Sequence, residues 1–255
     1  MTTLSAVKRL AIGVGGYRFL RWLLDHIFRR SRLRAMRADT LFLSGMIPAG
    51  VLCFDIGANV GDKSEAMHRA GAAVVAFEPL PECAAEIRAR FPARANVRVI
   101  QAAMGARDGL GVLHLARWTT MASFVPGWAG ADDAKQDLAV PVLTFDAARK
   151  ALGMPYFCKI DVEGWELELM SGMSEMPRVL CFEYHRNPEN LAKTRACVER
   201  LASLAPIELN IAPSEEFRLH LDRWMPPDAF VAWLRDDLPS TPAFGYGDIF
   251  ARRTD

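Results

Sequence analysis

The chain has 255 residues, of which 51% are apolar, and its formal net charge is only +1. These totals exclude an intrinsically disordered or collagen-like chain and fit a globular protein with a sizeable core. No apolar run approaches the roughly 20 residues that a membrane span requires, and we find no convincing signal peptide. The five cysteines form no C-x-x-C pair, so we expect reduced thiols, no zinc site and a cytoplasmic protein.

The positive charge is concentrated at the N-terminus. Residues 1–37 hold nine Lys or Arg and one acid, a net charge of +8, which leaves −7 for the remainder. Apolar residues at helical spacing predict an amphipathic helix over 17–30. Its basic side could be a solvated face, or it could contact an anionic membrane or a second subunit, whereas too little supports nucleic acid as a partner. We therefore divide the chain into a basic helical extension, residues 1–45, and a domain, residues 46–255.

From Val51 onward, short apolar runs alternate with helix-like segments. Strands are predicted over 51–55, 73–78, 97–102, 157–161, 179–183, 207–211 and 249–252, and helices over 62–70, 81–90, 145–152, 165–172, 189–203 and 228–235. Such repeated units predict an α/β fold, a mostly parallel sheet with helices on both faces. Residues 103–144 break the rhythm with two more strand candidates, 112–116 and 140–143, and a loop rich in Trp, Thr, Gly and Asp.

Four of the apolar strands end in acids, namely Asp55, Glu78, Asp161 and Glu183. Because acids rarely extend a buried strand, and because parallel strands end at one edge of a sheet, we expect these carboxylates to line a ligand site. Capping of the following helices is the alternative explanation.

The segment from Asp55 to Gly61 reads Asp-Ile-Gly-Ala-Asn-Val-Gly and leads directly into a predicted helix. Glycines in such a turn allow backbone geometry and close ligand approach that a side chain would block. Glu78 follows 23 residues after Asp55, where an acid can accept both hydroxyls of an adenosine ribose. The turn lacks the G-x-G-x-x-G pattern of dinucleotide sites, and a carboxylate at Asp55 would repel pyrophosphate. This combination favours S-adenosylmethionine, whose amino-acid end is cationic.

Three segments together resemble one known family. In chain order these segments are Asp55 to Gly61, Phe77-Glu78-Pro79 and Lys159-Ile-Asp-Val-Glu-Gly-Trp-Glu166. They are similar to the motifs of the FkbM family of S-adenosylmethionine-dependent methyltransferases. The resemblance covers about residues 50–185. It implies the Rossmann-like class I methyltransferase fold, with a seven-stranded, mostly parallel sheet, and here it would be preceded by N-terminal helices.

The resemblance also implies roles for individual residues. Cofactor contacts are expected from Asp55, Gly57, Asn59, Gly61, Glu78, Pro79, Gln101, Ala102 and Asp161. The first four would hold the methionine end, Glu78 the ribose hydroxyls and the segment around Gln101 the adenine. Asp161 would lie near the reacting methyl group. Characterised members mostly methylate oxygen, often on sugars or natural-product scaffolds, which here includes glycan or glycolipid acceptors.

A hydroxyl acceptor must lose a proton as it attacks, so a general base is expected. The candidates are Asp161, Glu163, Glu183 and His185, and His185 is attractive because its ordinary pKa lies near neutrality. The same set could instead hold Mg²⁺, although no metal is expected.

Aromatic and polar residues in the inserted segment suit contact with a carbohydrate acceptor. The candidates are Trp118, Thr120, Ser123 and Trp128. Two other functions remain open on the residues alone: an NAD-type oxidoreductase, against which the glycine pattern argues, and a non-catalytic module that binds S-adenosylmethionine.

Overall fold

A computed structural model of the chain describes residues 33–91, 95–115, 122–125, 136–214 and 217–255. The helix expected over 17–30 lies outside these residues, so its membrane or subunit contacts stay predictions. A helix over residues 33–46 does belong to the described part, and it packs on the domain through buried Met36 and Leu43. Asp39 fixes it further, because its carboxylate accepts a 2.6 Å bond from Lys63 Nζ and a 3.1 Å bond from the backbone N–H of Phe217.

A seven-stranded sheet forms the centre of the fold, in the order β10-β11-β9-β8-β1-β2-β3. Only β11 runs antiparallel to its neighbours. The strands are β1 (Leu52–Ile56), β2 (Ala73–Phe77), β3 (Val97–Ile100), β8 (Phe157–Ile160), β9 (Val179–His185), β10 (Ile207–Pro213) and β11 (Tyr246–Arg253). The predicted Rossmann-like α/β fold is confirmed, and the strand order reverses between β1 and β8, where open sheets of this class hold their ligands.

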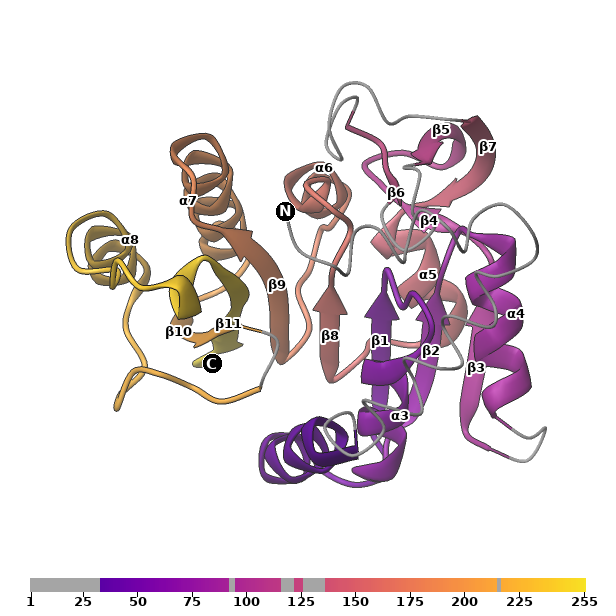
Figure 1. Cartoon of the computed structure of the whole chain (residues 1–255), viewed down its shortest axis with the longest axis horizontal. Coiled ribbons are helices and arrows are strands. Elements are labelled where there is room, and N and C mark those ends of the chain that lie inside the picture. Colours follow the sequence, from indigo (N-terminus) through magenta and orange to yellow (C-terminus); the bar gives the residue numbers. More distant parts are fainter. Residues whose placement is uncertain (1–32, 92–94, 116–121, 126–135, 215–216) are drawn as a thin grey trace, which may run out of the picture.

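Helices cover both faces of this sheet (Figure 1). They are α3 (Asp62–Arg69), α4 (Pro81–Arg90), α5 (Phe145–Leu152), α6 (Glu166–Ser171), α7 (Pro188–Ala202) and α8 (Pro227–Asp236), with a 3₁₀ turn over Pro242–Phe244. Local signals set several of their starts: Pro81 and Pro188 occupy first-turn positions, and the Thr144 side chain caps α5 by accepting from the backbone N–H of Ala147 at 3.1 Å. Each of the six helices predicted from position 62 onward is present.

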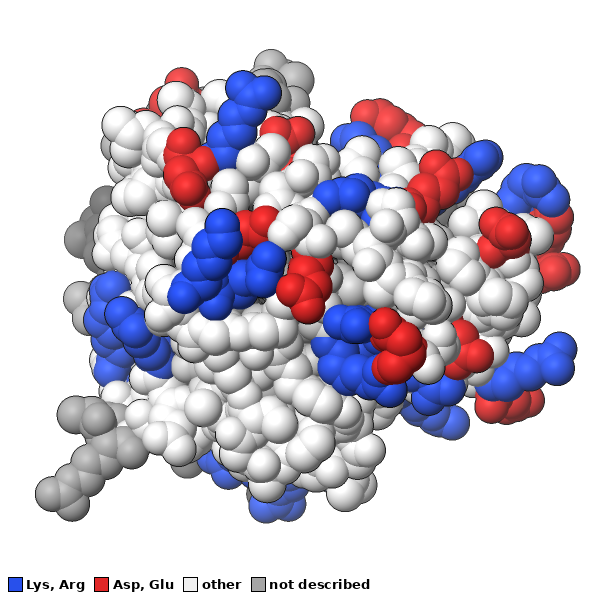
Figure 2. All heavy atoms as spheres, turned by 180° about the vertical axis from the view of Figure 1, so that it is seen from behind, with Lys and Arg blue, Asp and Glu red and all other residues white. Residues whose placement is uncertain are grey.

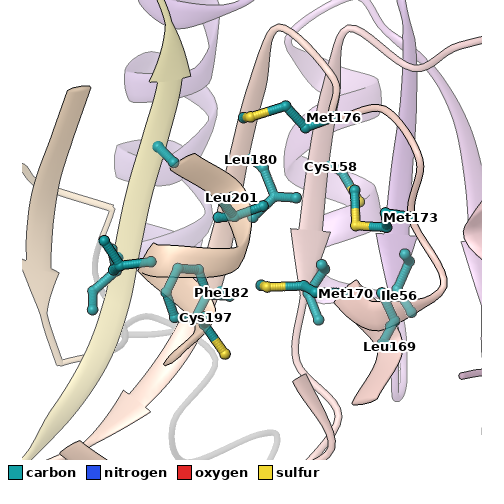
Figure 3. Close-up of a cluster of buried hydrophobic side chains, with 14 of the residues drawn as sticks. Ile56, Cys158, Leu169, Met170, Met173, Met176, Leu180, Phe182, Cys197 and Leu201 are labelled. Carbon is teal, nitrogen blue, oxygen red and sulfur yellow. The ribbon is translucent and has the colours of Figure 1, made fainter. Parts of the chain in front are cut away.

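The largest hydrophobic cluster lies between the sheet and the helices α5 to α8. Leu180 and Phe182 of β9 meet Met170 of α6 and Leu201 of α7 there, all fully buried (Figure 3). Full burial of each such side chain contributes roughly 1.5–3 kcal/mol. The opposite face of the sheet packs on α3 and on the helix over residues 33–46. Burial on both faces holds the strand ends in fixed positions, which the site requires.

A second, four-stranded sheet forms from the region in which the sequence rhythm breaks. Its order is β4-β7-β5-β6, with β4 (Ala103–Met104), β5 (Gly109–Leu115), β6 (Ala122–Ser123) and β7 (Gln136–Leu143). The two expected strands correspond to β5 and β7, whereas the two-residue strands β4 and β6 were not expected. Its inner side contributes Leu113, Val140 and Ala103 to a small apolar cluster with Leu80 and Cys83. The second sheet therefore lies against the loops that follow β2 and β3.

Charged side chains of both signs are mixed over the face seen in Figure 2, with broad uncharged areas between them. Among the described helices, none combines the length and the apolar character needed to cross a bilayer.

Candidate cofactor and catalytic site

The turn after β1 is held tightly between its two neighbouring strands. The backbone N–H of Gly57 donates to the carbonyl of Phe77 on β2 at 2.9 Å, and the backbone N–H of Asp161 donates to the carbonyl of Ile56 at 2.9 Å. Gly57 has φ +79°, and a Cβ added there would lie 1.7 Å from the carbonyl oxygen of Asp161. Only glycine therefore lets the ends of β1 and β8 approach this closely.

Glu78 follows β2 and is almost completely buried. Its carboxylate accepts two backbone bonds, from the N–H of Asn59 at 2.7 Å and from the N–H of Leu80 at 2.8 Å. Asn59 adopts the left-handed conformation, with φ +50°, while its N–H bonds Glu78. Burial raises the pKa of Glu78 to about 7, although the two N–H groups act in the opposite direction. The carboxylate is thus oriented by the backbone.

A cavity, partly open to solvent, lies over the ends of β1, β2 and β8. Six of the nine predicted cofactor residues line it: Gly57, Asn59, Glu78, Pro79, Ala102 and Asp161. The second sheet and its neighbouring loops add an apolar wall that includes Met104, Leu113 and Phe124, which the sequence did not identify as site residues. An apolar wall opposite an oriented carboxylate suits a nucleoside, whose base is flat and whose ribose carries hydroxyls.

The other three predicted cofactor residues do not line this cavity. Asp55 lies within β1 and is fully buried, and its carboxylate accepts a 2.5 Å bond from Ser64 Oγ on α3. Burial raises the pKa of Asp55. Gly61 faces Ile87 of α4, and Gln101 is exposed. One oxygen of the Asp55 carboxylate thus binds α3, the helix that starts at the turn, and the contact of Asp55 with the cofactor stays a prediction.

The loop between β8 and α6 carries two of the predicted catalytic acids, Asp161 and Glu163, and both line the cavity. Glu163 has φ +53°, an unusual conformation for a residue with a side chain. The buried carboxylate of Glu166 braces the loop by accepting the backbone N–H groups of Val162 and Gly164, each at 3.2 Å. Burial raises the pKa of Glu166 to about 7. Strained residues persist only where their surroundings hold them, and the bonds to Glu166 supply part of that support.

The other two predicted catalytic residues, Glu183 and His185, lie close to that loop at the end of β9. Their side chains are joined, with His185 Nε2 3.0 Å from Glu183 Oε2. The hydrogen bond to Glu183 raises the pKa of His185, and burial raises the pKa of Glu183. Oxygen and nitrogen atoms of Glu163, Glu183 and His185 all lie within 4.8 Å of one another, so these three could also hold a cation.

Of the acceptor candidates, only Ser123 lies within the described residues; Trp118, Thr120 and Trp128 lie outside them. Ser123 is buried, and its hydroxyl donates to the carbonyl of Glu163 at 2.7 Å while accepting from the backbone N–H of Val125 at 2.9 Å. These bonds connect β6 of the second sheet to the loop between β8 and α6. Ser123 therefore has a structural role in this geometry, and its contact with an acceptor stays a prediction.

Sequence reasoning missed the role of Lys159 and did not consider Asp248. The ammonium of Lys159 lies 3.1 Å from Asp161 Oδ2 and 3.1 Å from Asp248 Oδ1 of β11. A lysine inside the apolar strand segment 157–160 was a usable signal, because a buried cation requires an acidic partner. Nothing local in the sequence indicated that this partner stands 89 residues further on.

The residues around the cavity fit S-adenosylmethionine. Glu78 offers a buried, oriented carboxylate for ribose hydroxyls, Met104 and Leu113 offer apolar surface for the adenine, and Asp161 offers a carboxylate for a cationic sulfonium.

The chain is similar to several solved structures, at low sequence identity. A precorrin-6y C5,15-methyltransferase from Geobacter metallireducens is 15% identical, with 85% of this chain and 86% of that chain covered and a TM-score of 0.47. A magnesium protoporphyrin IX methyltransferase from Synechocystis, with bound S-adenosylmethionine, is 12% identical, with 100% and 98% covered and a TM-score of 0.47. A predicted O-methyltransferase from Agrobacterium tumefaciens is 12% identical, with 85% and 81% covered and a TM-score of 0.45. No curated protein sequence matches the chain.

The family is shown by a match to the methyltransferase FkbM domain, which covers residues 55–212. The match begins at the glycine turn, includes all three motifs and ends within β10. It favours a methyltransferase over the NAD-type oxidoreductase and over the non-catalytic module. The chain belongs to the FkbM family of methyltransferases, and S-adenosylmethionine is its cofactor.

Proposed function

We propose that the enzyme methylates a hydroxyl oxygen of a sugar, a glycan or glycolipid, or a natural-product scaffold. The observation that carries this proposal is the Glu183–His185 pair, joined at 3.0 Å beside the acids of the cavity. A hydroxyl becomes a good nucleophile only as its proton is removed, and a histidine oriented by a carboxylate is suited to that task.

Each site residue then has a distinct task. The cofactor, when bound, supplies a methyl group on a sulfonium. Glu78 binds the ribose hydroxyls, Asp161 faces the sulfonium, and His185 takes the proton of the acceptor hydroxyl while Glu183 stabilises the resulting imidazolium. The second sheet covers one side of the cavity and limits access of water, which leaves catalysis mostly a matter of alignment.

The free thiols support the proposal of a reducing, cytoplasmic location. All five cysteines are buried and none forms a disulfide. Peripheral membrane contact and self-association through the basic extension, residues 1–45, stay predictions from the charge of that segment.

The acceptor is tested by a screen for methyl incorporation. The purified full chain is incubated with S-adenosylmethionine carrying a labelled methyl group and with fractionated cell glycans, lipids and small molecules. We expect label in a neutral glycan, lipid-linked glycan or polyhydroxylated fraction, in a bond stable to mild base, as an ether is. Label found only in protein, nucleic acid or carboxyl esters would contradict the proposal.

Replacement of His185 by glutamine is expected to lower kcat by about 100-fold, because general bases contribute roughly 10²–10⁴ in rate. The hydrogen bond to Glu183 raises the pKa of His185 above its ordinary value of 6.5. The imidazole is therefore neutral only when the pH exceeds this raised pKa, and wild-type kcat/KM should rise as the pH passes it. The variant should lose this rise. The measurement is a pH–rate profile with the acceptor found in the screen, at saturating S-adenosylmethionine, so that the titration of Glu78 does not contribute to it.

His114 provides a matched control, because it also pairs with an acid, 2.8 Å from Asp137, but lies on the second sheet and is not part of the Glu163, Glu183 and His185 cluster. His114→Gln should keep the wild-type pH–rate profile.

A chelator distinguishes general-base chemistry from cation binding at Glu163, Glu183 and His185. Activity that is lost in chelator and restored by Mg²⁺ would assign a cation to these three residues. Activity insensitive to both chelator and His185→Gln would contradict both roles.

A further inference from the structure

Three charged residues form a buried group at the edge of the cofactor cavity, which we call the Lys159 triad: Lys159, Asp161 and Asp248. The ammonium of Lys159 lies between the two carboxylates, 3.1 Å from each. The side chains of Lys159 and Asp248 are only 5% and 7% exposed, whereas that of Asp161 is 34% exposed and lines the cavity. The triad thus has two members in the protein interior and one member facing the ligand.

The ammonium stays charged in this position. Burial by itself lowers the pKa of a lysine, but Asp161 and Asp248 hold the pKa of Lys159 well above its ordinary value. A buried cation with one acid forms a neutral pair. Here the second acid changes the balance, because one positive and two negative charges leave the triad with a net charge of −1.

Asp248 comes from the antiparallel strand β11, where it stands opposite Glu183 of β9. Residue 248 lies beyond the segment that matches the FkbM domain, which ends at residue 212. Strand β11 therefore also supplies a member of the triad. Its Asp248 does not line the cavity and binds the ammonium of Lys159 from within the protein.

We propose that Asp248 is a positioning residue. It shares the ammonium of Lys159 with Asp161, so that the negative charge of Asp161 is not fully neutralised and attracts the cationic centre of the cofactor. Without Asp248, the ammonium would pair with Asp161 alone, and the cavity would lose its attraction for a sulfonium. The inference rests on the placing of the sulfonium at Asp161 in the proposed function.

Two cofactor analogues measure this attraction without a methyl acceptor. Sinefungin carries an amine, protonated at neutral pH, in the place of the methylsulfonium, whereas S-adenosylhomocysteine is neutral there. The ratio of their dissociation constants, measured by calorimetry with the full chain, reports the electrostatic attraction at the place of the methylsulfonium. A general weakening of the fold lowers the affinity for both ligands alike and leaves this ratio unchanged.

The wild-type protein should bind sinefungin more tightly than S-adenosylhomocysteine. Asp248→Asn should lower that preference by about tenfold, because one unit of charge is lost from a poorly solvated group a few ångströms from the ligand. Asp161→Asn should lower it similarly. Asp248→Glu, which keeps the charge, should retain most of the preference. Should the asparagine variant not fold, Asp248→Thr removes the same charge with a residue suited to a strand.

Asp39 provides the control, because it is a buried acid paired with a lysine, 2.6 Å from Lys63 Nζ, away from the cavity. Asp39→Asn should leave the preference unchanged. A preference unchanged in Asp248→Asn but lowered in Asp161→Asn would overturn this inference alone. A preference unchanged in both, or absent from the wild-type protein, would overturn the placing of the sulfonium at Asp161 as well.

Discussion

Replacing Glu78 by glutamine is expected to weaken the binding of S-adenosylmethionine by about 100-fold. The carboxylate accepts from the backbone N–H groups of Asn59 and Leu80 at 2.7 and 2.8 Å, and glutamine can accept only one of these while its amide donor meets the other. A buried donor left without a partner costs about 1–3 kcal/mol, and the charge-assisted bonds to the ribose hydroxyls are lost in addition. Calorimetric titration with S-adenosylmethionine measures the loss.

The pH dependence of wild-type binding provides an independent check. Burial raises the pKa of Glu78 to about 7, and ribose hydroxyls donate to its ionised form, so affinity should fall by up to about tenfold per pH unit below 7. The stability of the ligand-free protein should change in the opposite direction. A folded-state pKa above the ordinary 4.5 means that the folded state binds the extra proton, so the contribution is full below pH 4.5 and is lost as the pH rises through about 7.

Glu82 is an exposed acid at the start of α4, four residues further along, and serves as the control. Glu82→Gln should bind like the wild type at every pH. A Glu78→Gln protein with wild-type affinity, or with the wild-type pH dependence of binding, would remove Glu78 from the cofactor site.

Most of the central sheet could be predicted because its information is local. An apolar run such as 179–182 is typical of a buried strand, and Pro81 and Pro188 mark helix starts whatever surrounds them. In the second sheet, only β5 and β7 carried such a local signal. Its strands β4 and β6 have two residues each and exist only through pairing with distant partners, as in Ala103 with Val142 and Ser123 with His114. Two residues are too few for a hydrophobic period.

The candidate site was predictable to the extent that it lies at strand ends. Glu78 and Asp161 follow the last residues of β2 and β8, and both line the cavity as expected. Asp55 differs because it lies inside β1, which is buried on both faces and gives no alternation to show the direction of its side chain. Asp248 could not be found at all, since its link to Lys159 depends on the antiparallel placing of β11 beside β9.

Substitution of Gly57 by alanine is expected to destabilise the protein by about 2–4 kcal/mol, the sum of a forced steric displacement and of left-handed backbone strain. The added Cβ would lie 1.7 Å from the carbonyl oxygen of Asp161, which is backbone and cannot rotate away. The ends of β1 and β8 would have to separate, and that movement carries Asp161 out of position. Denaturant unfolding should show the loss of stability, and titration should show a loss of affinity for S-adenosylmethionine.

Gly50 separates the two contributions, because its φ of +81° nearly equals the +79° of Gly57, but an added Cβ would meet nothing within 4 Å. Gly50→Ala therefore reports backbone strain alone and should cost about 1 kcal/mol, with cofactor affinity unchanged. The difference between the variants is the free energy of the close approach of β1 to β8. Equal stability and equal affinity in the two variants would show that the turn does not need this approach, and that the glycine serves backbone conformation only.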